Sequence, residues 1–363
     1  MPKESTLNIQ ESIKLLGERL GFISVMEERI HDNNFYAPIY DVVWYLDLSK
    51  VFNMESLKPL FVNNPRQYEK LLRLPFAGFE IEGANTSSKN QISNFANLYS
   101  GHFVYNFVVV NNDGAKNEED TYRRGIKINS YFRQMSGMKN VYFLDKKHLN
   151  EAIEKYVDCD TAIKYTETKV EDRSKFGGEN RSVGVYEKIK DSLISTGMIF
   201  KQNWSPEFGK LLFKIDSKCV TNDKFTDFVL HKRYYASPYE LEAKVSKKTS
   251  DSYYVPKLDV VLGFNAPESF KEWMKCLSVA VKEQYVDYPI LFGLREKLLS
   301  EIFIPLISIE IETSVNKHLN GGIFNMSKNS YCGILVTEEE AASHLQFFAK
   351  EMGINNVVTY CVS

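Results

Sequence analysis

The chain has 363 residues, of which 44% are hydrophobic and 25% charged, and its formal net charge is −2. This composition is typical of a globular protein with enough apolar material for about two domains. The near-neutral charge shows no global basic character, although acidic metal-binding groups can offset a local basic cleft. No apolar run approaches membrane-spanning length and no signal core begins the chain. We expect a cytoplasmic protein without a membrane segment.

Cysteine and histidine usage excludes other classes. The five cysteines are scattered and form no Cys-x-x-Cys pair, which indicates reduced thiols rather than zinc ligands or disulfides. The six histidines form no His-x-His or His-Glu-x-x-His pattern, which argues against a zinc hydrolase. The sequence also lacks a Gly-rich phosphate loop, so it encodes no ATP-driven motor.

The first half predicts helices that alternate with strands. In chain order we expect an amphipathic helix over 7–30, a strand over 37–46, a helical or irregular region over 54–73, a buried strand over 76–83, a helix over 86–98, a strand over 104–110, a helix near 119–135, a strand over 140–144 and a helix over 146–156. Such alternation predicts an α/β fold with a mixed sheet flanked by helices.

The strand over 76–83 carries Glu80 and Glu82 inside an apolar run. Side chains alternate along a strand, so both glutamates point to one face while Phe79 and Ile81 point to the other. Two carboxylates about 7 Å apart on one face repel each other and are costly to bury. A divalent cation would make the arrangement favourable; a half-exposed strand with two solvated glutamates is the alternative.

The second half repeats these motifs in the same order. Glu310 and Glu312 repeat the Glu-x-Glu pair, and Asp259 repeats Asp41 of the preceding strand. The parallel segments are 186–200 with 11–23, 256–262 with 38–44, 331–336 with 105–110 and 354–358 with 138–142, while a polar segment over 316–327 replaces the helix after Glu82. We predict an internal duplication; two unrelated α/β domains are the alternative.

A polar, Gly-containing stretch over 171–182 marks the domain boundary. We expect a first domain over 1–170 and a second over 171–363, joined near 160–184. The second contains an insert over 201–255 that is rich in lysine and tyrosine. Cations beside aromatic residues suit contact with phosphates and bases, and a solvated surface is the alternative. The candidate DNA contacts are Arg123, Arg124 and Lys127 in the first half and Lys232, Arg233, Tyr234, Lys247 and Lys248 in the insert.

One aspartate on a strand and Glu-x-Glu on the next give three carboxylates able to converge on Mg²⁺, with Mn²⁺ or Ca²⁺ as substitutes. A cation held in this way acidifies a bound water for attack on a phosphodiester and stabilises the developing negative charge. The predicted metal ligands are Asp41, Glu80 and Glu82, and in the second half Asp259, Glu310 and Glu312.

These residues carry a family resemblance. Asp41, Glu80 and Glu82, in helix–strand–strand–helix–strand order, resemble the PD-(D/E)xK nuclease superfamily. The segments Asp41-Val-Val-Trp44 and Phe79-Glu-Ile-Glu82 are similar to those of restriction-endonuclease-like proteins with a Phe-Glu-Val-Glu signature. The resemblance covers residues 10–157 well and 185–363 loosely. It implies two tandem restriction-endonuclease-like domains, catalytic roles for the six carboxylates, and a prokaryotic source.

The sequence departs from this pattern in two places. The superfamily's usual lysine is replaced by Glu82 and by Glu312, which leaves the general base unassigned. Lys89 is a candidate for the vacancy, with a surface lysine at a helix start as the alternative, and Lys317 or His318 would serve in the second half. Gly321 and Gly322 weaken the second copy's helix by about 1 kcal/mol each relative to alanine.

We therefore expect a Mg²⁺-dependent endonuclease that hydrolyses double-stranded DNA, as a type II restriction enzyme does, and whose halves form a pseudo-dimer. The protein would act as a monomer or homodimer. Two alternatives remain open from the sequence: a non-catalytic DNA-binding protein on a nuclease-derived fold, and a structure-specific DNA repair nuclease.

Overall fold

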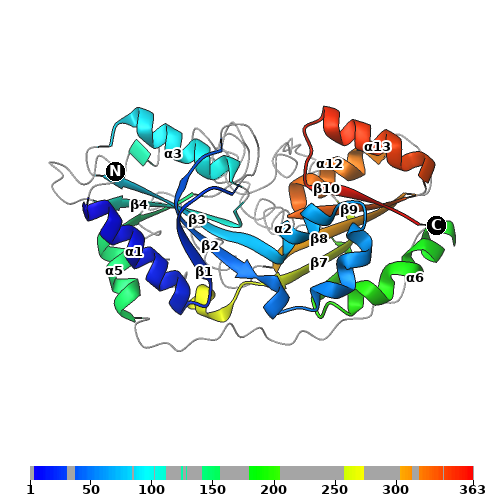
Figure 1. Cartoon of the computed structure of the whole chain (residues 1–363), viewed down its shortest axis with the longest axis horizontal. Coiled ribbons are helices and arrows are strands. Elements are labelled where there is room, and N and C mark those ends of the chain that lie inside the picture. The colour runs from blue at the N-terminus through cyan, green and yellow to red at the C-terminus, as the bar shows by residue number, and fades with distance from the viewer. Residues whose placement is uncertain are drawn as a thin grey trace, which may run out of the picture.

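The computed structural model describes residues 4–30, 37–83, 86–101, 103–111, 124–125, 128, 141–155, 180–204, 257–273, 303–312, 319–337 and 339–362. The chain forms two α/β halves that lie side by side, each built on a five-stranded mixed sheet (Figure 1). The predicted fold class, two tandem α/β domains with helices on the faces of a mixed sheet, is confirmed. The expected boundary at 170/171 lies outside the described residues. No helix of the described residues is both long and apolar enough to span a bilayer.

The first half has the sheet order β1-β2-β3-β4-β5, in which β1, β2 and β3 are antiparallel and β3, β4 and β5 are parallel. Its elements are α1 (Glu4–Arg19), β1 (Ile23–Glu28), β2 (Tyr40–Asp47), η1 (Leu48–Lys50), η2 (Met54–Phe61), α2 (Pro65–Leu72), β3 (Arg73–Gly83), α3 (Ser88–Ser100), β4 (Tyr105–Asn111), β5 (Val141–Asp145) and α5 (Lys146–Lys155).

The second half repeats that order and those directions with strands β6 to β10. Its elements are α6 (Asn180–Ile194), β6 (Ile199–Trp204), β7 (Leu258–Asn265), a short helix over 268–273, β8 (Phe303–Glu312), α12 (Leu319–Asn329), β9 (Cys332–Thr337), α13 (Glu339–Glu351) and β10 (Val357–Cys361).

The strand registers support the predicted duplication residue by residue. Val42 pairs with Phe79 in the first half, and Val260 pairs with Ile309 in the second. Each ladder then carries an irregularity at the same place, between Trp44 and Tyr45 and between Leu262 and Gly263. Asp41 and Asp259 therefore occupy equivalent positions on equivalent strands, as do Glu80 and Glu310.

Several predicted boundaries are wrong. The helix expected over 7–30 ends at Arg19, and strand β1 follows it. The reason is Gly21, whose φ of 90° reverses the chain in a conformation that favours glycine; Gly197, with φ 74°, does the same after α6. On α3, Phe95 and Leu98 make the contact with the sheet, while Ile92 is 43% exposed.

The polar segment after Glu312 forms helix α12, which includes Gly321 and Gly322 as expected. Three further corrections concern the second half. The expected pairing of 331–336 with 105–110 is shifted by one residue, because Cys332 rather than Tyr331 takes the place of Tyr105 in the ladder. Helix α6 begins inside the predicted linker, and β6 takes up the first residues of the predicted insert.

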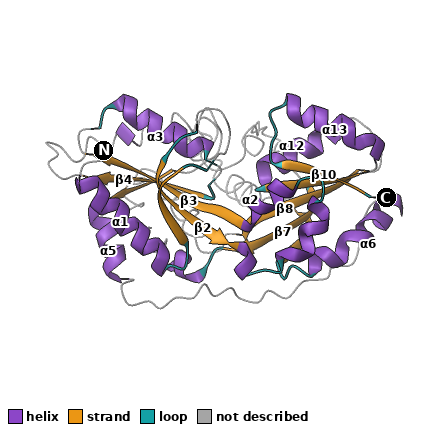
Figure 2. Ribbon diagram, viewed as in Figure 1, coloured by secondary structure: helices purple, strands orange, loops and turns teal. Residues whose placement is uncertain are grey.

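Each sheet is covered on both faces (Figure 2). In the first half, α1 and α5 pack on one face and α3 on the other; in the second, α6 packs on one face and α12 and α13 on the other. The faces covered by α1 and by α6 belong to one continuous hydrophobic core that spans both halves. The halves therefore share apolar contacts rather than meeting through a polar interface.

The segment that follows β2, the strand that carries Asp41, packs on the second half. Figure 1 shows α2 beside the strands of the second half. The Asn53 backbone N–H donates to the Thr196 carbonyl oxygen at 3.0 Å, and the Phe52 ring lies 5.8 Å from that of Phe264. Helix α6 and strand β10 contact η2.

The segment that follows β7, the strand that carries Asp259, packs in turn on the first half. The helix over 268–273 packs on the first half, where the Phe270 ring lies 4.8 Å from Phe76 and 4.6 Å from Tyr105. Ser269 Oγ donates to the Leu20 carbonyl oxygen at 3.1 Å. Each half thus completes its core with a segment from the other, as protomers do in a domain-swapped dimer.

Because of this exchange, truncating Phe270 should destabilise the whole chain. We expect Phe270→Ala to lower the free energy of unfolding by about 3–5 kcal/mol, since the buried ring leaves a cavity in the shared core. Phe347→Ala is the matched control, because Phe347 is 64% exposed on α13, and it should change stability by less than about 0.5 kcal/mol. Denaturant unfolding should give one transition for both halves; two separate transitions would contradict the shared core.

Candidate active sites

Asp41 lies where β2 begins, just before the β2/β3 ladder begins at Val42 and Phe79. The next residues outward are Asp41 and Glu80, so the antiparallel register places them opposite each other on one face. The Asp41 carboxylate accepts the Ile81 backbone N–H at 2.6 Å and the Gln10 Nε2 at 2.8 Å. The side chain therefore extends the β2/β3 ladder past its last backbone pair, and each of its two oxygens accepts a hydrogen bond.

Glu80 is buried and forms a carboxyl pair with Asp41. Its side chain is 4% exposed and hydrogen-bonds to Asp41, and Asn97 Nδ2 donates to its Oε1 at 3.3 Å. Burial, and then the neighbouring Asp41 charge, raise the pKa of Glu80 well above its usual range. A hydrogen bond between two carboxyl groups needs a proton. Burial raises the pKa of both Asp41 and Glu80, so the pair favours sharing one proton over carrying two charges.

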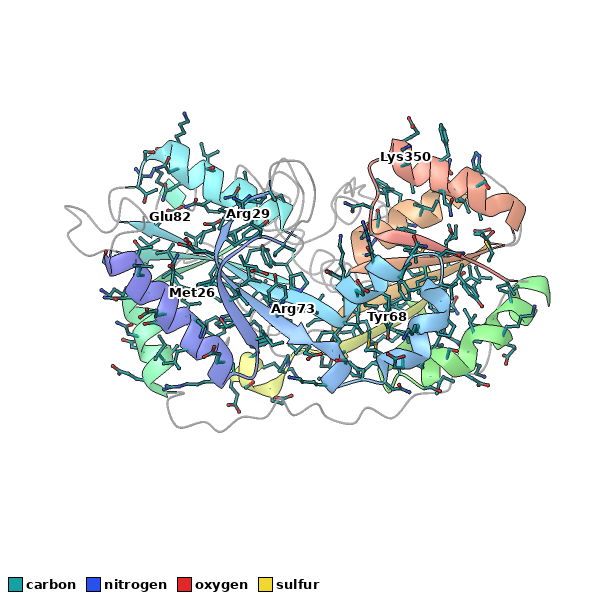
Figure 3. The ribbon with its side chains drawn as sticks, in the orientation of Figure 1. Met26, Arg29, Tyr68, Arg73, Glu82 and Lys350 are labelled. Carbon is teal, nitrogen blue, oxygen red and sulfur yellow. The ribbon has the colours of Figure 1, made fainter. Side chains whose placement is uncertain are left out.

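Glu82 lies on the same face of β3, beneath α3 (Figure 3), but contacts that helix instead of Asp41. Gln91 Nε2 donates to Glu82 Oε2 at 2.5 Å, and Asn94 Nδ2 donates to Oε1 at 3.4 Å. Burial raises the pKa of Glu82 to about 7, while these hydrogen bonds and the Arg124 charge oppose the rise.

The second half repeats the carboxyl pair. The Ile311 backbone N–H donates to Asp259 Oδ2 at 3.1 Å, and Glu310 hydrogen-bonds to Asp259. Burial first, and then the Asp259 charge, raise the pKa of Glu310 to about 9. Glu312 is partly exposed at the end of β8. The same two backbone-anchored carboxyl groups therefore recur in both halves.

The surroundings of the two pairs differ. Helix α3 directs amides toward the first site, whereas α12 approaches Glu310 at Gly322, where an added Cβ would lie 3.7 Å from Glu310 Cγ. Tyr186 stands on α6 where Gln10 stands on α1, and its hydroxyl accepts Gln202 Nε2 at 2.8 Å. The duplication thus preserves the carboxyl pair more closely than its environment.

The remaining predicted site residues have other surroundings. Lys89 is exposed in the first turn of α3, and the contacts of this helix with Glu82 come from Gln91 and Asn94. Arg124 is turned inward, toward Gln91. The other predicted DNA contacts lie outside the described residues: Arg123, Lys127, Lys232, Arg233, Tyr234, Lys247 and Lys248. Lys317 and His318 also lie outside them.

Sequence reasoning missed the polar residues that surround the carboxylates. Gln91, Asn94 and Asn97 recur at helical spacing along α3, so they form one amide stripe that faces β3. Gln10 is fully buried on α1, an unusual position for an amide. The stripe was visible in the sequence as polar residues at i, i+3 and i+6, beside the apolar positions Phe95 and Leu98.

Among the described residues, no group of three or more His, Cys, Asp or Glu side chains is arranged to hold a metal ion. The structure pairs Asp41 with Glu80 and Asp259 with Glu310, and it leaves Glu82 with the amides of α3. Mg²⁺ is nevertheless commonly bound through one or two carboxylates together with substrate phosphates and water. Among the residues that the structure describes, no lysine or arginine pairs with Asp41 or Glu80, and two buried acids of this kind fit such an ion.

Comparison of the chain with protein-family models, with curated proteins and with solved structures gives no match. Conclusions about function therefore depend on the carboxyl pairs themselves.

The raised pKa of Glu310 predicts how stability changes with pH in the metal-free protein. The unfolded chain loses this proton near pH 4.5 and the folded chain near pH 9, so the free energy of unfolding should fall as pH rises between these values. In EDTA, Glu310→Gln should remove part of that fall and stabilise the protein at pH 9 by on the order of 1–3 kcal/mol. Denaturant unfolding at several pH values measures this; Glu351→Gln, at an exposed glutamate, is the control. Parallel pH profiles for the wild type and Glu310→Gln would contradict the burial of an acid there.

Proposed function

We propose that the chain is a Mg²⁺-dependent endonuclease that hydrolyses phosphodiester bonds of double-stranded DNA, with one candidate site in each half. The observation that carries this proposal is the twice-repeated pair of buried carboxyl groups, Asp41 with Glu80 and Asp259 with Glu310. Structural ion pairs place opposite charges together, whereas each of these pairs places two acidic groups together in a buried position. Such an arrangement is unfavourable unless a proton or a cation joins the two groups.

Asp41 and Glu80 would hold the cation of the first site, and Asp259 and Glu310 that of the second. When bound, Mg²⁺ would lower the pKa of a water molecule and offset the charge that develops on the phosphate. Before the ion binds, the proton shared by each pair must leave, so binding releases protons. The Ile81 N–H and Gln10 keep the Asp41 carboxylate in place when that proton has left.

Glu82 has a separate role in this proposal. It lies on the same face as the pair but is held by Gln91 and Asn94, so it is not committed to Asp41. A third carboxylate beside a two-carboxylate cation site is in a position to accept a proton from the attacking water. We assign this role to Glu82 in preference to Lys89, which is exposed on α3.

The exchange of segments between the halves supports a pseudo-dimeric enzyme. Dimeric nucleases place one site on each strand of a duplex through two-fold symmetry. Here the symmetry is internal to one chain, and the different surroundings of the two sites suit an asymmetric target. Internal symmetry and an asymmetric target favour a type II restriction enzyme over a structure-specific repair nuclease.

A non-catalytic role for the second half is the alternative that one observation favours. Gly322 brings α12 against Glu310 without a side chain at that point, whereas α3 supplies amides to the first site. In that case the second half would hold DNA, and the cut would come from Asp41 and Glu80 alone.

A plasmid assay tests the two-site proposal. In Mg²⁺, wild-type protein should convert supercoiled DNA to linear DNA, because each site cuts one strand. Glu80→Ala and Asp259→Ala should each stop at nicked circles, since one carboxyl pair remains intact in each variant. Agarose gels of supercoiled, nicked and linear DNA over time provide the measurement.

Glu69→Ala, at an exposed position on α2, is the matched control and should linearise DNA as the wild type does. Full double-strand cutting by Asp259→Ala would show that the second half only binds. Full cutting by Glu80→Ala would contradict the assignment of the first site. No cleavage by the wild type in Mg²⁺ or Mn²⁺, with DNA binding retained, would favour a non-catalytic DNA-binding protein.

A further inference from the structure

Arg124 is half-buried, and its guanidinium donates to polar groups of the protein. Its Nε donates to Gln91 Oε1 at 2.5 Å, and its Nη2 donates to the Thr86 carbonyl oxygen at 2.6 Å, just before α3. The guanidinium therefore connects the start of α3 with a side chain one turn further along the helix. Two of its three nitrogens are used inside the protein.

The contact with Arg124 fixes which way the Gln91 amide faces. A guanidinium has only N–H donors, so the Gln91 oxygen must face Arg124. The Gln91 NH₂ group then faces the opposite way, where it donates to Glu82 Oε2 at 2.5 Å. Glu82 and Arg124 thus hold opposite ends of one amide, and removing Arg124 would free the oxygen end and loosen the donor that Glu82 accepts.

We propose that Arg124 is a positioning residue of the first site, which acts on Glu82 by orienting the Gln91 amide. The inference rests on the proposed function in assigning Glu82 to a site of phosphodiester cleavage. It replaces the reading of Arg124 as a direct phosphate contact. Glu82 thereby gains an oriented donor. Its charge lies beside the cation that Asp41 and Glu80 would hold, so a partner that fixes Glu82 affects both cation affinity and cleavage.

A double-mutant cycle tests this chain of contacts. The variants are Arg124→Met, Gln91→Leu and the combination of both, each in an Asp259→Ala background so that only the first site is measured. The first readout is Mn²⁺ binding without DNA, followed by electron paramagnetic resonance of the free ion. The second is the rate of plasmid nicking in Mg²⁺ at saturating DNA, with KM for DNA and its salt dependence.

If Arg124 acts through Gln91, each single variant should weaken Mn²⁺ binding and slow nicking about 10–100-fold. The double variant should be no worse than the single variants, because the second change removes nothing further. KM for DNA and its salt dependence should stay unchanged. Controls are Arg66→Met and Asn90→Leu, at exposed positions on α2 and α3, which should match the background protein.

Other outcomes separate the possibilities. Additive losses in the double variant, or a salt slope reduced by about one unit in Arg124→Met, would overturn the positioning role and leave the nuclease proposal intact. A non-additive loss of Mn²⁺ binding in a protein that cuts no DNA would support the positioning role and overturn the nuclease proposal. Absence of both Mn²⁺ binding and cleavage in the background protein would overturn both. Thermal melting identifies any variant that has lost its fold, and Arg124→Gln then replaces Arg124→Met.

Discussion

One type of hydrogen bond, made once in each half, sets the geometry of both candidate sites. The ladder between β2 and β3 ends before Ile81, so the Ile81 N–H would lack a strand partner there, and Asp41 supplies the acceptor. A buried N–H without a partner is costly, which explains why a carboxylate is retained at this point. The same register brings Asp41 against Glu80. The arrangement that gives the Ile81 N–H an acceptor therefore also places Asp41 beside Glu80. The same arrangement recurs at Asp259 and Ile311.

The apolar side of the sheet gives that pair a rigid support. Trp44 lies on β2 close to Asp41, its ring is 4.5 Å from Phe79 and 5.1 Å from Trp273, and its Nε1 donates to the Ile13 carbonyl oxygen at 3.1 Å. Trp273 belongs to the segment contributed by the second half. Interiors packed at crystal-like density transmit small displacements, so the position of the first carboxyl pair depends on the other half of the chain. This coupling favours a chain in which the two halves work on one substrate.

The sequence was sufficient where the signal is local. Alternation along a strand put Glu80 and Glu82 on one face, and ordered repetition placed Asp259 with Asp41. It was insufficient where position depends on distant contacts. The helix expected through Gly21 ended there because a positive φ, which periodicity does not report, turns the chain into β1. The exchanged segments were not predictable, since nothing local in Phe270 says which half its ring will enter. The amide stripe on α3 was overlooked because the apolar positions beside it dominated the pattern.

The three carboxylates of the first half have different partners, and the reason is electrostatic. Asp41 and Glu80 can share one proton, but a third acid in the same contact would add repulsion that no single proton relieves. Glu82 avoids this by bonding to α3 amides, which donate hydrogen bonds without adding charge, and Arg124 lies behind one of them. The positive charge is then close enough to favour the Glu82 carboxylate, yet it forms no salt bridge that would occupy the oxygens directly. A directly paired arginine would compete with a cation for the carboxylate oxygens. An arginine that acts through the Gln91 amide holds Glu82 in place without binding those oxygens itself.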